Sequence, residues 1–292
     1  MTDIVQIVVL GVALGGVYAL MASGLTLIFG VMRIVNLSQP IFIITAAYIS
    51  YFLFDLYGLD PLLSVPITMA ALFLIGLVLY KLVLEKEAAS ARYSEMTVLL
   101  TFGVALSVDG LLGTLFSNTQ RVTTPDYATD ALILGDVFLP KGWLYAGLTS
   151  ILIIGLLVLF LHYTRFGYAI RATTQNRAAA QLMGVNVNLV CLITFGIGLS
   201  LAGAAGALVS FVFSFFPAKQ WDWIAILLAL VVLGGMGKLH GMIIATFTLT
   251  IISAFVGAYF GATWSGMTFY LALFLILLIR PQGLFGDPVE EA

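Results

Sequence analysis

The chain has 292 residues, of which 62% are hydrophobic and 9% are charged. Soluble domains carry about 25% charged residues, so this chain cannot coat a globule with charge and must expose apolar side chains to lipid. Its net charge of -2 and its 12 scattered Lys and Arg residues exclude a polybasic nucleic-acid partner, and its single cysteine, Cys191, excludes an intrachain disulfide.

Long apolar runs predict membrane-spanning helices along the whole chain. Residues 4–29 contain no charged residue. This run is much longer than a strand of a membrane barrel, which has about ten residues. It also exceeds the length of about 20 residues that a helix needs to cross the hydrocarbon. Eight more segments follow, at 40–54, 62–80, 96–116, 143–161, 189–216, 223–237, 242–260 and 264–279. The second, seventh and ninth segments have only 15 or 16 residues, a length typical of half-helices or re-entrant pieces. We predict an all-α polytopic membrane protein, one domain over 1–292, with eight or nine transmembrane helices including short or broken ones.

Basic residues and tryptophans predict the orientation, because Lys and Arg are retained in cytoplasmic loops and Trp prefers the interfaces. With the N-terminus outside and the C-terminus in the cytoplasm, the outer helix ends hold all four tryptophans: Trp143, Trp221, Trp223 and Trp264. Only three basic residues then lie outside, Arg121, Lys141 and Lys219. Nine lie inside: Arg33, Lys81, Lys86, Arg92, Arg165, Arg171, Arg177, Lys238 and Arg280.

Two connections are long enough to carry a role. Residues 117–142 form a polar outer loop, predicted to be either an outer cap or a solvated connector. Residues 164–188 form a cytoplasmic loop with three arginines and no acidic residue. Within it, Asn176 is suited to cap a short helix over 177–183, which Gly184 ends. Such a helix could dock a partner protein. The alternative is that the positive charge of the loop only fixes the orientation of the chain in the membrane.

Catalytic groups are too few for an intramembrane enzyme. Asp109 is the one acidic residue within the predicted spans, so no carboxylate pair is formed, and His162 and His240 are not part of a zinc motif. A lone intramembrane aspartate is a candidate functional residue or a helix cap. The glycine-rich run 234–238 fails as a phosphate loop because Leu239 follows Lys238. We predict no catalytic residue, no cofactor and no metal site.

Polar breaks between apolar runs indicate a transport path. The first break holds Asn36, Ser38 and Gln39, and the second holds Gly234, Gly235, Gly237 and Lys238. A polar solute in the membrane needs donors and acceptors that apolar spans lack, and interrupted helices provide them. The alternatives are that Asn36 and Ser38 only cap the second helix and that the glycine run is only a tight turn.

Several motifs, in order along nearly the whole chain, resemble the shorter permease type of branched-chain amino-acid ABC importers. Residues 16–31 resemble the first helix of that family, and 171–186 resemble its coupling segment. The other motifs are Leu201-Ala202-Gly203-Ala204-Ala205-Gly206, Leu233-Gly234-Gly235-Met236-Gly237 and Arg280-Pro281-Gln282-Gly283-Leu284-Phe285-Gly286.

The resemblance implies a permease subunit of an ATP-driven importer in the bacterial inner membrane, taking up branched-chain or other amino acids. The implied partners, besides membrane lipid, are a second permease, two cytoplasmic ATPases and an outer solute-binding protein. The cytoplasmic loop would couple to an ATPase through Arg165, Arg171, Gln175, Arg177, Leu182, Met183 and Gly184.

Two departures from the family pattern bear on the solute. The family usually has His-Gly shortly after the residue matching Asn36, where this chain has Ser38-Gln39-Pro40, and apolar Ile226 replaces a frequent polar residue. Urea, a short amide, or an aromatic or other organic acid is therefore an alternative solute, and a passive channel is an alternative class.

Overall fold

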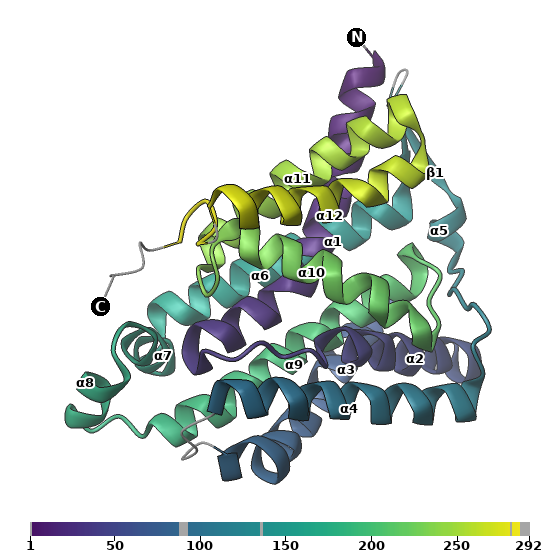
Figure 1. Cartoon of the computed structure of the whole chain (residues 1–292). Helices are drawn as coiled ribbons and strands as arrows, with labels where there is room; N and C mark the ends of the chain where they lie inside the picture. Colours follow the sequence, from purple (N-terminus) through teal and green to yellow (C-terminus); the bar gives the residue numbers. More distant parts are fainter. Residues whose placement is uncertain (1, 88–92, 135–136, 281, 287–292) are drawn as a thin grey trace.

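The protein is a bundle of helices in the computed structural model, which describes residues 2–87, 93–134, 137–280 and 282–286 (Figure 1). Within these ranges, nine helices are long and apolar enough to cross a membrane. They are α1 (Thr2–Met32), α2 (Gln39–Tyr57), α3 (Pro61–Leu79, continued by a π-helical turn over Tyr80–Leu84), α4 (Tyr93–Phe116), α6 (Lys141–Tyr163), α9 (Val187–Val212), α10 (Gln220–Gly234), α11 (Leu239–Phe260) and α12 (Ala262–Ile279). The predicted all-α polytopic class is confirmed. Of the residues singled out above, Arg92 and Pro281 lie outside the described residues.

Two of the three predicted short segments are longer helices than their apolar runs. α2 has 19 residues and α12 has 18, because residues such as Gln39 and Thr263 continue each helix beyond its apolar run. The third segment, predicted at 223–237, is shifted instead: α10 has 15 residues and ends at Gly234, and a 3-10 turn over Pro217–Lys219 precedes it. In α2, the helix begins at Gln39 and ends at Tyr57, where Gly58 adopts a φ of 64°.

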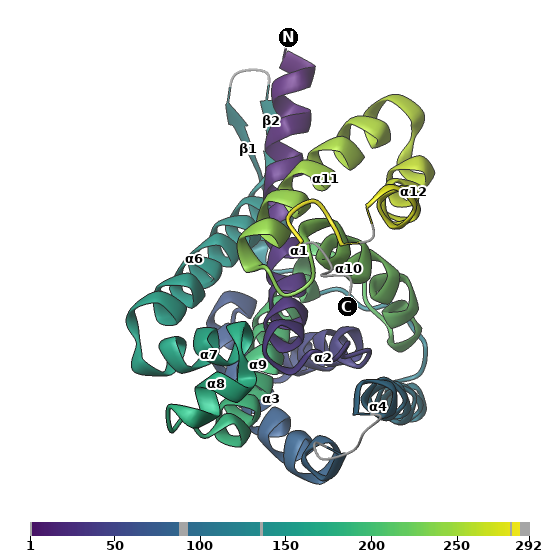
Figure 2. The same ribbon diagram turned by 60° about the vertical axis from the view of Figure 1, so that its left-hand side comes forward.

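α9 is the central helix of the bundle (Figure 2). In the most apolar 18-residue stretch of each helix, 78% of the residues of α9 are buried, compared with 17% for α4 and 11% for α12. α9 packs against α1, α2 and α3. The small residues at 201–206 make this possible, since a Cβ on Gly203 would lie only 3.1 Å from the Cα of Met69. α4 and α12 are peripheral, with most of their surface available to lipid or to partner proteins.

The loop at 117–142, predicted to be outer, is folded against the bundle. It contains α5 (Asp126–Thr129) and an antiparallel hairpin of β1 (Ala131–Leu134) and β2 (Val137–Pro140). Before α5, Arg121 and Phe215 exchange backbone hydrogen bonds of 3.0 and 2.9 Å, which tie the loop to the chain after α9. The Tyr127 hydroxyl donates to Asp60 Oδ1 over 3.0 Å. Burial and this hydrogen bond raise the pKa of Tyr127 above its ordinary value, so the hydroxyl remains a donor.

The loop at 164–188, predicted to be cytoplasmic, contains two helices, α7 (Arg165–Gln175) and α8 (Arg177–Leu182), of which the sequence predicted only the second. Thr164 caps α7 by accepting from Gly167 N–H over 3.0 Å, and Asn176 caps α8 by accepting from Ala179 N–H over 2.9 Å. α7 and α8 lie far from the N-terminus and the hairpin in both views (Figures 1 and 2). The predicted inner and outer loops thus occupy opposite ends of the molecule.

Candidate functional site

The first predicted break is a buried polar cluster whose groups bond to one another. Asn36 Oδ1 accepts from the N–H of Ser38 over 3.1 Å and from its hydroxyl over 2.6 Å. Asn36 Nδ2 donates to Gln39 Oε1 over 3.4 Å, and Gln39 Nε2 donates to the carbonyl of Gly198 on α9 over 3.1 Å. Thr101 on α4 accepts from Leu37 N–H over 3.3 Å. Four helices therefore meet at this cluster, because α1 leads into it and α2 begins in it.

The second predicted break is a tight turn between α10 and α11. Gly235 and Gly237 have φ values of 88° and 83°, a region that side chains with a Cβ rarely adopt. A Cβ on Gly237 would lie 2.9 Å from the Cα of Gly30, so the turn rests directly on α1. Residues 282–286 cover its other side, where Leu284 N–H donates to the carbonyl of Leu233 over 2.9 Å. This geometry explains the glycine motif and the motif at 280–286 together.

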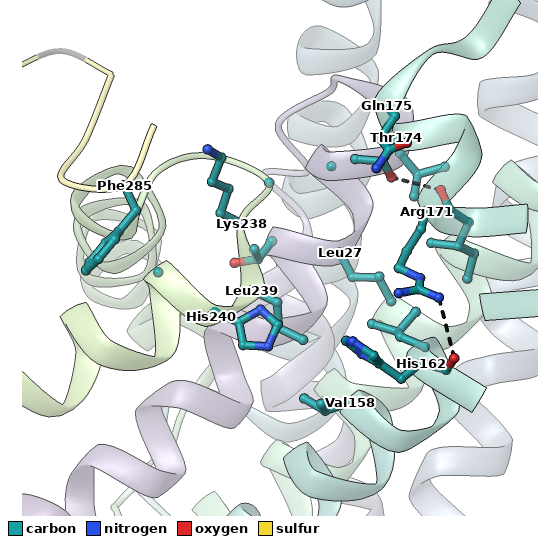
Figure 3. Close-up of a pocket in the computed structure, with 17 residues that line it drawn as sticks. Leu27, Val158, His162, Arg171, Thr174, Gln175, Lys238, Leu239, His240 and Phe285 are labelled. Atoms are coloured by element: carbon teal, nitrogen blue, oxygen red, sulfur yellow. Dashed lines mark hydrogen bonds between the residues drawn. The ribbon is translucent and has the colours of Figure 1, made fainter. Parts of the chain in front are cut away.

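A cavity of about 570 Å³ joins this turn to the cytoplasmic loop (Figure 3). Its wall includes Gly237 and Lys238 from the predicted solute path and Arg171 and Gln175 from the predicted coupling segment. Asn36, Ser38 and Gln39 do not line it. The structure thus brings together two groups of residues that the sequence separated by more than sixty positions, and leaves the third group apart.

The predicted coupling residues divide into two sets. Leu182 and Met183, at the end of α8, are 89% and 86% exposed, and Gly184 follows them with a φ of 84°. Arg171 instead turns back toward α6: its Nη2 donates to the carbonyl of His162 over 3.4 Å, and its guanidinium lies 4.7 Å from the ring of Tyr168. The exposed apolar pair can meet a partner directly, whereas Arg171 faces the cavity.

The remaining two arginines of the cytoplasmic loop also have different surroundings. Arg165 is exposed at the start of α7. Arg177 is half-buried and shares with Glu85 a second hollow, of about 600 Å³, under the end of α8. The hollow is also lined by residues 184–188, which connect α8 to α9. Arg177 is therefore placed to hold α8 against the bundle.

His162 and His240 are site residues that the sequence did not assign. Both line the cavity, and their ring centroids lie 6.4 Å apart at an interplanar angle of 89°. Their common position at the predicted inner ends of two apolar runs was visible in the sequence, but their proximity depends on α6 and α11 both packing against α1. Among the described residues, no group of three or more His, Cys, Asp or Glu could hold a metal ion.

Comparison with known proteins gives matches to a transport family, to curated relatives and to a solved structure. The family described as branched-chain amino acid transport system / permease component matches residues 7–278. The chain is 28% identical over 278 residues to the probable branched-chain amino acid transport permease protein LivH of Methanocaldococcus jannaschii, covering 91% of this chain and 88% of that protein. It is 25% identical over 297 residues to the high-affinity branched-chain amino acid transport system permease protein BraD of Pseudomonas aeruginosa, covering 98% and 97%. Among solved structures it is similar to PsaBC from Streptococcus pneumoniae in complex with Fab, with a TM-score of 0.48 and 13% identity over 94% of this chain and 92% of that one.

Proposed function

This chain belongs to the family of permease components of branched-chain amino acid transport systems, and we propose that it carries branched-chain amino acids inward in an ATP-driven importer. The observation that carries the proposal is the family match over 7–278, together with full-length relatives that are named for this transport. As a permease subunit the chain is a multi-pass membrane protein. We propose that it hydrolyses no ATP itself and depends on partner ATPase subunits.

The surface supports two kinds of partner contact. At the end of α8, the side chains of Leu182 and Met183 are 89% and 86% exposed. They form an exposed apolar contact surface for a cytoplasmic ATPase. Along α4, exposed Gly103, Ser107 and Gly110 form a small-residue face, and a Cβ on either glycine would meet nothing within 4 Å. Such faces allow close packing of membrane helices, which favours a second permease beside α4. An outer solute-binding protein delivers the solute at the end that holds the hairpin.

Coupling follows from the shared cavity. Closure of the ATPases displaces α7 and α8 as one unit, because α8 packs on α7. Arg171 and Gln175 of α7 face Gly237 and Lys238 across the cavity, so movement of α7 changes the support of the α10–α11 turn. That turn lies directly on Gly30 of α1. The turn therefore passes the displacement to the helix that leads into the cluster at 36–39.

The solute path runs beside the polar clusters at 36–39 and 234–238. Asn36, Ser38 and Gln39 are 1%, 1% and 0% exposed, and together with the buried hydroxyl of Thr101 they place donors and acceptors inside the bundle. Their hydrogen bonds to one another form the closed state of the path. A passing amino acid replaces some of these bonds with its own ammonium and carboxylate groups.

A second candidate solute is urea or a short amide. The observation that favours it is the uncharged character of the cluster, where Ser38-Gln39-Pro40 stands in place of a histidine pattern, together with apolar Ile226 on α10. An aromatic or other organic acid is a further alternative solute, and a passive channel is the alternative class.

Uptake by the complete transporter tests the solute. The permease, its partner subunits and its binding protein are reconstituted in liposomes loaded with ATP, and radiolabelled leucine is supplied with unlabelled competitors. Isoleucine and valine should suppress leucine uptake at micromolar excess, while urea, acetamide and benzoate should not. Suppression by an amide or by benzoate alone would contradict the amino-acid assignment, and uptake without ATP would contradict the importer.

A further inference from the structure

The cavity of about 570 Å³ has a deep apolar part and a cationic rim. Its buried floor comes from α1 and α6, through Leu27, Val31 and Leu161, which are 7%, 3% and 8% exposed. At the rim, His162 and His240 are exposed, and Arg171 and Lys238 are half-buried. Figure 3 shows Arg171, His162 and His240 near one another, with Lys238 on the facing turn. The volume lies within the range of about 300–1,000 Å³ typical of small-molecule sites.

The charge of this rim selects for an anion. The described residues that line the cavity include Arg171 and Lys238 but no aspartate or glutamate. Arg171 uses one terminal nitrogen on the carbonyl of His162 over 3.4 Å, and the donors that it can offer to a ligand at the rim are its other terminal N–H groups. A guanidinium offers five N–H donors in a planar fork, so Arg171 can accommodate a phosphate oxygen without losing its present hydrogen bond.

The apolar face beside the cavity is suited to lipid. α6 presents Leu152, Leu156 and Leu159 outward, at 62%, 56% and 52% exposure, next to the cavity residues Val158 and Leu161 on the same helix. In the proposed orientation this end of α6 lies at the cytoplasmic interface, where anionic headgroups collect and basic pockets between helices bind them. An acyl chain can follow the outer face of α6 while its headgroup remains at the rim.

We propose that the cavity binds an anionic phospholipid of the cytoplasmic leaflet, with the headgroup phosphate at the guanidinium of Arg171 and part of one acyl chain against Leu27, Val31 and Leu161. The two histidines donate hydrogen bonds to the glycerol or headgroup oxygens. The leaflet assignment rests on the proposed function, since it uses the same orientation. Bound lipid fills the space between α7 and the α10–α11 turn. A displacement of α7 therefore moves the turn as well, because no empty space remains between them.

Lipid retention by the whole purified transporter tests the proposal. The complex is exchanged into micelles containing phosphatidylglycerol and phosphatidylcholine, and bound lipids are counted by native mass spectrometry. The wild type should retain phosphatidylglycerol preferentially. Arg171→Gln should lower that retention about fivefold, and the double change His162→Ala with His240→Ala, which removes both ring donors, should also lower it. Arg171→Lys, which keeps the charge, and Lys81→Gln, at an exposed basic residue outside the cavity, should keep it.

Two results would overturn the proposal. The first is equal retention in the wild type and the cavity variants, provided that each variant assembles and melts as the wild type does. The second is displacement of the bound lipid by the solute that the transporter is found to carry, which would assign the cavity to the transport path. The comparison of retention among the variants uses no transport and no solute, so it can be interpreted even if the solute assignment is wrong.

Discussion

Gln39 donates a hydrogen bond from Nε2 to the backbone carbonyl of Gly198 over 3.1 Å, joining the first residue of α2 to the middle of α9. The other end of the same amide accepts from Asn36 Nδ2 over 3.4 Å. Both contacts are buried, so the orientation of the Gln39 amide is set on two sides. Any solute that binds here must compete with these two hydrogen bonds, and this makes Gln39 the most informative position in the proposed path.

Replacing Gln39 with alanine should change solute recognition as well as stability. The change leaves the Asn36 amide without its acceptor and removes the donor to Gly198, at a cost of about 1–3 kcal/mol in the free energy of unfolding. Because the cluster contributes to the path, the apparent affinity for leucine should fall at least several-fold and the order of preference among competing amino acids should change. Both are measured by uptake in proteoliposomes, alongside thermal unfolding.

Ser50→Ala is the matched control for this change. Ser50 is fully buried on α2 and hydrogen-bonded to Ser64 over 2.7 Å, but it lies three turns beyond the cluster. Its loss should lower stability by about 1 kcal/mol and leave solute preference intact. If Gln39→Ala affects stability alone, as Ser50→Ala does, the cluster only shapes the start of α2.

Gly237→Ala should destabilise the protein more than Gly58→Ala. Both glycines have positive φ, 83° and 64°, a conformation that costs an L-residue about 1–2 kcal/mol. At Gly58 a Cβ meets nothing within 4 Å, whereas at Gly237 it would lie 2.9 Å from the Cα of Gly30. The larger drop in melting temperature at Gly237 measures this close approach. Equal melting temperatures for the two variants would show that the α10–α11 turn can move away from α1 freely.

Arg121 should contribute more to stability than an exposed ion pair at the same end of the molecule. Its guanidinium carbon lies 5.2 Å from the ring centroid of Tyr51 and 5.6 Å from that of Phe52, within an aromatic enclosure. Arg121→Gln should cost about 1–2 kcal/mol through lost cation–π contact. Lys141→Gln, which breaks a 2.8 Å pair with exposed Asp130, should change stability much less, because an ion pair in water is weak. Chemical unfolding monitored by tryptophan fluorescence compares them, and an Arg121 variant as stable as the Lys141 variant would refute the role of the rings.

Cysteine labelling should establish the orientation with little background. The one native cysteine, Cys191, is 1% exposed, so it should not react with a membrane-impermeant maleimide. Lys86→Cys and Thr129→Cys introduce thiols at exposed positions near opposite ends of the bundle. In intact cells, Thr129→Cys should be labelled and Lys86→Cys should react only after the membrane is opened. The reverse pattern would invert the predicted topology.

Apolar patterning was sufficient to predict the membrane-spanning helices, because nearly every one contains an uninterrupted apolar run, whereas a helix of a soluble protein has apolar residues on one face only. It underestimated α2 and α12, where residues such as Gln39 and Tyr57 extend a helix beyond its apolar run. It also missed α7, whose composition is mixed and whose start depends on the cap at Thr164. Asn176 and Gly184, in contrast, are local signals, and α8 begins and ends where they predict.

The candidate site was only partly accessible from the sequence for a similar reason. Polar breaks and glycine runs stand out along a chain that is otherwise apolar, so residues 36–39 and 234–238 could be singled out. The proximity of Arg171 to Lys238, and of His162 to His240, depends on how α6, α7 and the α10–α11 turn pack around α1. Such proximity has no counterpart in spacing along the chain, and a single sequence contains no signal for it.

The exposed pair at the end of α8 carries the claim that this permease is driven by ATP through its cytoplasmic loop. The direct measurement is ATP-dependent leucine uptake by proteoliposomes containing the complete transporter with Leu182→Ser and Met183→Ser combined. Leu82→Ser, at a 63% exposed apolar residue of the π-helical turn after α3, is the control. The α8 variant should lose at least 90% of uptake, because about 1.4 kcal/mol of lost docking energy is a tenfold change, while the control keeps wild-type uptake. Wild-type uptake by the α8 variant in a fully assembled complex would contradict coupling through this loop.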